Sequence, residues 1–202
     1  PTWTATVEFE GSAAISLLSA KTTLQMPIGE RASLSGSIRR TYFDQTAARV
    51  IDDIPEYYFY DGNLKAFNEL SDRDHVTISG YGGRDFLDVI FNPEATEEQG
   101  ISVDWANKTG SVRWTRVLTP KLFGNFWLTG SRFSSDFELN IVDITERNLV
   151  TDVTLKGALE YHRSEVLVTR FGFEKNLHVL YRQDFPEGLI NVDHDPRHYV
   201  LY

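Results

Sequence analysis

YYFYDGNLKAFNELSDRDHVTISGYGGRDFLDVIF, residues 57–91, is the stretch that decides the fold. It predicts two long strands, roughly Tyr58–Leu70 and His75–Asp85, joined by a polar turn at residues 71–74. Apolar and polar side chains alternate along both strands, which indicates a sheet with one apolar and one polar face. Each strand runs to about ten residues or more, whereas strands of soluble domains mostly stop near five or six.

The rest of the chain repeats this pattern. We expect further strands at residues 3–9, 12–26, 33–42, 101–117, 122–133, 153–162, 168–184 and 199–202, with a turn at Glu10-Gly11 between the first two. Short turns are predicted at 27–32, 71–74, 119–121 and 163–165, and long connections at 43–57, 86–100, 134–149 and 185–198. Short turns at one rim and long loops at the other are typical of bacterial outer-membrane barrels. The sequence therefore predicts an all-β, antiparallel transmembrane β-barrel, of which about nine to ten strands are present.

Composition excludes several classes of function. The net charge is −9, which argues against a nucleic-acid partner because phosphate binding requires a basic surface. There is no cysteine, so disulfide scaffolds and thiolate metal sites are excluded. No run of 18 or more apolar residues is present, which excludes a transmembrane helix.

The alternation assigns polar and aromatic side chains to different surroundings. Polar residues inside the predicted strands are expected to face the barrel lumen: Asp61, Asn63, Lys65, Arg113, Lys156 and Glu160. Aromatic residues near the strand ends are expected to form a girdle at the lipid interface: Tyr42, Tyr57, Tyr58, Tyr60 and Trp114. In a soluble sandwich the same aromatic residues would instead pack between two sheets.

Chemistry-bearing motifs are scarce. Asp193, His194, Asp195 and His198 combine carboxylate and imidazole groups that suit a metal ion, but Asp, His and Pro also gather at loop tips because they form turns. We expect no metal and no other cofactor. No G-x-S-x-G motif or other catalytic set is visible, so an enzyme is not predicted.

Several segments resemble a known family. They are residues 36–42 (GSIRRTY), 57–61 (YYFYD), 70–74 (LSDRD), 79–85 (SGYGGRD), 120–123 (PKLF) and 183–186 (QDFP). Together they are similar to the barrel portion of TonB-dependent outer-membrane receptors of the Bacteroidetes type. The resemblance spans most of the chain, and its motifs are strand ends and rim turns.

The resemblance implies a bacterial outer-membrane location and a barrel of about 22 strands with a plugged lumen. Residues 1–202 would form part of that single barrel domain, and the plug domain and the remaining strands would lie outside this sequence. The implied function is uptake of a scarce solute, driven through TonB. The implied partners are outer-membrane lipid, TonB through the plug region and, as an option, a SusD-like surface lipoprotein.

Two other functions remain open. One is a smaller complete barrel that acts as a passive pore or an adhesin-like protein, for which the aromatic last residue, Tyr202, is typical. The other is a soluble β-sandwich that serves as a binding module. The loops carry no signature of the solute in any of these cases.

Overall fold

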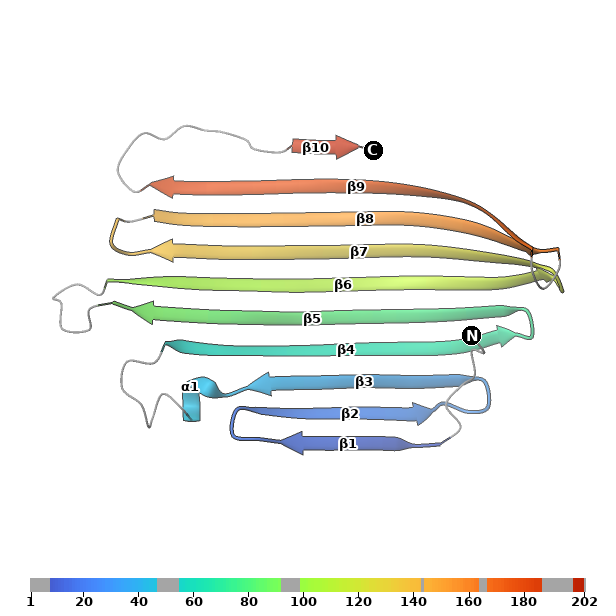
Figure 1. The fold of residues 1–202 in the computed structure, drawn as a ribbon, viewed down its shortest axis with the longest axis horizontal. Helices are drawn as coiled ribbons and strands as arrows, with labels where there is room; N and C mark the ends of the chain where they lie inside the picture. The colour runs from blue at the N-terminus through green and yellow to red at the C-terminus, as the bar shows by residue number, and fades with distance from the viewer. Residues whose placement is uncertain are drawn as a thin grey trace.

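Ten strands form one antiparallel sheet in the order of the sequence, as the computed structural model shows (Figure 1). The structure describes residues 8–46, 55–91, 99–142, 144–163, 167–186 and 198–201. The strands are β1 (Glu10–Ile15), β2 (Ser19–Pro27), β3 (Ala32–Thr41), β4 (Glu56–Ser71), β5 (Asp74–Ile90), β6 (Gly100–Thr119), β7 (Leu122–Leu139), β8 (Ile144–His162), β9 (Val168–Pro186) and β10 (His198–Leu201). One short helix, α1 (Phe43–Thr46), follows β3. The all-β, antiparallel prediction is confirmed.

The hairpin of residues 57–91 is β4 and β5. Asp72 and Arg73 form its turn, where the Ser71 hydroxyl accepts hydrogen bonds from the backbone N–H groups of Arg73 (3.2 Å) and Asp74 (3.1 Å). β5 continues to Ile90, so the prediction that a long connection begins at Phe86 is wrong. Residues 86–90 keep the extended pairing with β6, and the connection shrinks to the residues between Ile90 and Gly100.

The N-terminal part contains a hairpin where one strand over residues 12–26 was predicted. Glu10 and Gly11 belong to β1 and do not form a turn. The reversal lies at residues 16–18, where the Ser16 hydroxyl accepts hydrogen bonds from the N–H groups of Leu18 (3.2 Å) and Ser19 (3.1 Å). A serine whose hydroxyl accepts hydrogen bonds from backbone N–H groups in this way favours a turn. Here it reverses the chain within residues 12–26, where the alternation of apolar and polar residues predicted one strand.

The predicted long connection at residues 134–149 is also wrong. β7 runs to Leu139 and β8 starts at Ile144, so only a tight turn separates them. Residues 133–139 do alternate, but Phe133 and Phe137 occupy the parity that carries polar residues earlier in the same strand. The apolar side chains therefore change from one face to the other along this strand. A prediction that expects apolar residues on the same face throughout ends the strand too early.

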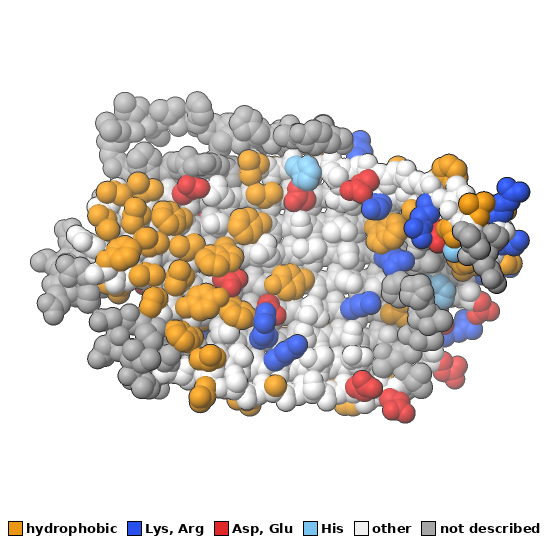
Figure 2. Space-filling model, viewed as in Figure 1, with side chains coloured by type: hydrophobic (Ala, Val, Ile, Leu, Met, Phe, Trp, Pro, Cys, Tyr) orange, Lys and Arg blue, Asp and Glu red, His pale blue; other side chains and the backbone are white. Residues whose placement is uncertain are grey.

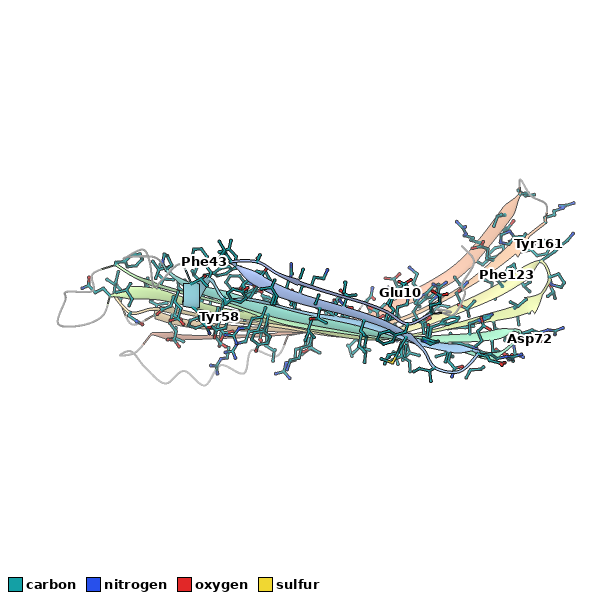
Figure 3. All side chains as sticks on the ribbon, turned by 90° about the horizontal axis from the view of Figure 1, so that it is seen from below. Glu10, Phe43, Tyr58, Asp72, Phe123 and Tyr161 are labelled. Carbon is teal, nitrogen blue, oxygen red and sulfur yellow. The ribbon has the colours of Figure 1, made fainter. Side chains whose placement is uncertain are left out.

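The sheet is a single layer. Strands β4 to β9 are 16 to 20 residues long, about 53 to 66 Å at 3.3 Å per residue. Figure 3 shows this layer edge-on, twisted and bent near the ends of β8 and β9. Phe67, at 8% exposure, is the only buried large apolar side chain among the described residues, and these residues include no second sheet packed on the first.

The sheet is open in the part of the chain that the structure describes. β1 pairs with β2 alone and β10 pairs with β9 alone, so the two edge strands do not meet. The register also defines two faces, because directly opposite residues of an antiparallel pair lie on the same side. The Leu64 face carries the even residues of β2 to β7 and the odd residues of β8 and β9, and the Lys65 face carries the others.

Candidate functional site

The six residues expected to face a lumen share one side of the sheet. Asp61, Asn63 and Lys65 of β4 lie on the Lys65 face, and so do the remaining three, which are Arg113 of β6 and Lys156 and Glu160 of β8. Figure 2 views this face, whose middle is covered by small polar side chains with scattered charges. The bend at the ends of β8 and β9 turns toward this face, so the face is concave there.

Cross-strand pairs connect the polar side chains of the Lys65 face. The pairs are Arg39 with Asp61 (Nε to Oδ2, 2.9 Å), Asn63 with Ser37 (2.8 Å), Lys156 with Glu174 (3.1 Å), Arg170 with Glu160 (2.8 Å) and His178 with Asp152. Each pair joins directly opposite residues, the arrangement that stabilises neighbouring strands. These pairs link polar side chains of neighbouring strands on this face while the side chains stay partly exposed, as a water-filled surface requires.

The Leu64 face carries a broad uncharged band. Ala66, Ile78, Val112, Leu128 and Leu155 lie directly opposite one another across five strands. Ile78 is 54% exposed, Leu128 52% and Leu155 46%, so nothing in the described residues covers them. Exposed apolar patches larger than a few hundred Å² mark sites that contact a partner or a membrane.

Charged residues limit this band at both ends. On β6, Lys108 and Arg116 are the nearest charges, and between them the Leu64 face carries Gly110, Val112 and Trp114. Eight residue steps at 3.3 Å give about 26 Å, and transmembrane strands need about 9–11 residues. Arg116 pairs with Asp74 at 3.6 Å at one end, and Arg84 pairs with Asp104 near the other. Lys175 of β9 is the exception, an exposed cation within the band.

The five aromatic residues predicted at the lipid interface do not all lie on the same face of the sheet. Tyr58 and Tyr60 lie on the Leu64 face near the long connections, and Trp114 lies on the same face near the short turns, stacked on Phe126 at 5.4 Å. Tyr57 occupies the Lys65 face, because adjacent residues of a strand point to opposite sides, and its grouping with Tyr58 is corrected. Tyr42 follows β3, and its hydroxyl donates to the Ser16 and Ser19 carbonyls at the β1–β2 turn.

An aromatic patch on the Lys65 face was not found from the sequence. We call this group the loop-end patch; it consists of Phe59, Leu87, Trp105, Phe133 and Phe137. These residues belong to the neighbouring strands β4 to β7 and lie on one face near the long connections, at the left of Figure 2. The Arg39 guanidinium lies 4.6 Å from the centroid of the Phe59 ring. The sequence does contain a sign of this patch. Within β4 to β7 the apolar residues change between even and odd positions, because Leu64, Val112 and Leu128 of the same strands lie on the other face.

Two titratable groups adjoin this patch. Burial raises the pKa of Asp85, and the nearby Asp61 carboxylate raises it further. Burial also raises the pKa of Tyr57, whose hydroxyl lies 3.5 Å from Asp85 Oδ1. Both shifts therefore disfavour negative charge beside the loop-end patch.

The weak metal candidate of the sequence analysis lies outside the part of the chain that the structure describes. Asp193, His194 and Asp195 are not among the described residues, and the side chain of His198 is not described, so the expectation of no metal there stays a prediction. No group of three or more His, Cys, Asp or Glu residues that suits a metal ion occurs among the described side chains.

No helix in the described residues is long and apolar enough to cross a membrane. Comparison of the chain with models of protein families and with curated proteins gave no match.

Proposed function

We propose that this chain forms part of the wall of an outer-membrane β-barrel, with the Leu64 face toward lipid and the Lys65 face toward the lumen. The uncharged band of the Leu64 face carries the proposal. It is about as long as a transmembrane strand requires, and the opposite face at the same level holds the network of polar pairs. A lumen filled with water hydrates such a network, and lipid covers the exposed apolar side chains.

The proposed activity is that of a TonB-dependent receptor of the Bacteroidetes type, which takes up a scarce solute through a larger, plugged barrel of about 22 strands. The strand lengths support this reading, because strands of 16 to 20 residues exceed the membrane and extend the wall on the side of the long connections. On that extension the loop-end patch lines the inner side, where a solute arrives first. Outer-membrane lipid, TonB and a surface lipoprotein are the corresponding partners.

The assigned faces are tested by substitutions in β8. Asp in place of Leu155 or Leu159 puts a charge into lipid, so we expect loss of the assembled protein from the outer-membrane fraction. Ala in place of Lys156 or Glu160 removes an exposed ion pair, which contributes little to stability, so assembly should persist. Assembly is measured in a Gram-negative host by membrane fractionation and by the heat-dependent shift in gel mobility.

Equal tolerance at both pairs of positions would contradict the assigned faces. A monomer that stays soluble without detergent and shows no heat-dependent shift would favour the soluble binding module. The mass of the intact protein separates the two barrel functions, because a receptor is several times longer than a small passive pore.

A further inference from the structure

Two cations face each other on the Leu64 face. Lys108 of β6 and Arg132 of β7 are directly opposite residues of the register, and both side chains are exposed. Their outer neighbours in the same row are Gly82 of β5 and Thr151 of β8, neither of which carries a charge. Like charges placed directly opposite destabilise a strand pair.

No acidic side chain in the described residues forms an ion pair with Lys108 or Arg132; Asp152, next to Thr151 on β8, pairs with His178 on the Lys65 face. The nearest carboxylates on the Leu64 face are Asp104 and Asp136, which form ion pairs with Arg84 and Arg147. Each lies four residues along its own strand from the cation, about 13 Å at 3.3 Å per residue. Lys108 and Arg132 make no hydrogen bond or ion pair with any residue of the described ranges, so their charge is available to an external anion.

A trough adjoins the two cations. It is shallow and open, with a volume of about 550 Å³, and Gly82, Gly110, Gly130, Thr151 and Val153 line it together with Lys108 and Arg132. The row of residues between them, which includes Asp152, contributes to the lining as well. A Cβ atom built at Gly110 or Gly130 would meet nothing within 4 Å. Val112 and Leu128 are the next residues of β6 and β7 on the Leu64 face beyond Gly110 and Gly130, so the trough lies between the two cations and the apolar side chains of the uncharged band.

From this arrangement we infer that Lys108 and Arg132 bind the phosphate of an anionic lipid, whose acyl chain crosses the glycine-lined trough toward the apolar side chains of the uncharged band. The inference rests on the proposed function, because it needs the Leu64 face to contact lipid. The two cations mark the limit of the uncharged band, which is the depth of a headgroup. A phosphate between them replaces like-charge repulsion with two charge-assisted contacts, and Arg is suited to bidentate phosphate binding.

The test uses the whole protein in non-ionic detergent, titrated with short-chain phosphatidic acid and followed by thermophoresis. We expect Lys108→Gln with Arg132→Gln to weaken binding roughly tenfold or more, because two charge-assisted hydrogen bonds are lost. Lys175→Gln is the matched control, since it removes an exposed cation from the same face, four residues along β9 from the row that holds Lys108 and Arg132, and it should leave binding unchanged. Gly110→Leu, which fills the trough and keeps both cations, should also weaken binding.

Three results would overturn the inference: unchanged binding in the double variant, an equal loss with Lys175→Gln, or binding of inorganic phosphate as tight as that of phosphatidic acid. The last result would identify a site for free anions. The heat-dependent gel shift separates this failure from failure of the proposed function. If the unmodified protein shows no shift, the proposed membrane barrel is contradicted. If the shift is normal but the double variant binds the lipid as before, only the proposed lipid site is contradicted.

Discussion

At the scale of single residues, neighbours along one strand meet different surroundings. Leu155 is 46% exposed on the Leu64 face, and Lys156, the next residue, pairs with Glu174 on the Lys65 face. The same holds for Leu64 and Lys65 of β4, which the sequence pattern assigned correctly to two faces. Side-chain parity is therefore predictable from sequence wherever a single face stays apolar over several residues.

Asp85 provides a test at this scale. Its pKa is raised in the folded protein by burial and by Asp61, so at pH values between the unfolded and the folded pKa the native state binds more protons than the unfolded chain. The protein should therefore lose stability as the pH rises from about 4, the unfolded value, through the raised pKa. Asp85→Asn cannot ionise, so we expect it to be more stable than the unmodified protein at pH 8 and no more stable at pH 4.

Unfolding midpoints in denaturant, measured in detergent at the two pH values, check this expectation. Asp88→Asn is the control, because Asp88 lies three residues further along β5 on the opposite face. A gain for Asp85→Asn that is as large at pH 4 as at pH 8 would contradict a raised pKa at this position.

At the scale of elements, the change of apolar face within a strand is the feature that sequence reasoning missed. In β7, Phe126 and Leu128 lie on the Leu64 face, whereas Phe133 and Phe137 lie on the Lys65 face. If apolar residues are expected on one face only, such a strand is predicted to end where they move to the other face. Residues 134–149 were predicted as a connection for this reason. The hairpin at residues 16–18 was missed for a different reason, since its serine turn lacks Gly and Pro.

Two substitutions in β6 test whether the uncharged band lies in hydrocarbon. Val112→Arg places a cation in the middle of the uncharged band and should cost about 2–4 kcal/mol, whereas near the interface the cost falls to about 0–1 kcal/mol. Ser102→Arg lies on the same face of the same strand but beyond the band, opposite Asp88 and Glu138, and should cost little. The free energy of unfolding of the protein refolded into lipid vesicles measures both. Equal costs would show that the band does not lie in hydrocarbon.

At the scale of the whole molecule, one sheet layer leaves both faces without a protein partner in the described residues. With one large buried side chain among its described residues, the ten-stranded sheet buries too little apolar surface there to offset the entropy of ordering its chain, so its faces need other contacts. A lipid exterior and a hydrated lumen supply both contacts at once. The β-rich fold and its antiparallel pairing followed from the sequence, but closure into a barrel depends on contacts between strands far apart in the chain.

The accessibility of alternate residues along β8 tests the central claim most directly. The chain has no cysteine, so single cysteines can be introduced at positions 153 to 159 and spin-labelled without removing native thiols. In lipid vesicles we expect apolar oxygen to reach labels at Val153, Leu155 and Leu159, and a water-soluble nickel chelate to reach labels at Thr154, Lys156 and Ala158. Equal access of the nickel chelate to both sets would contradict a sheet with lipid on one side and water on the other.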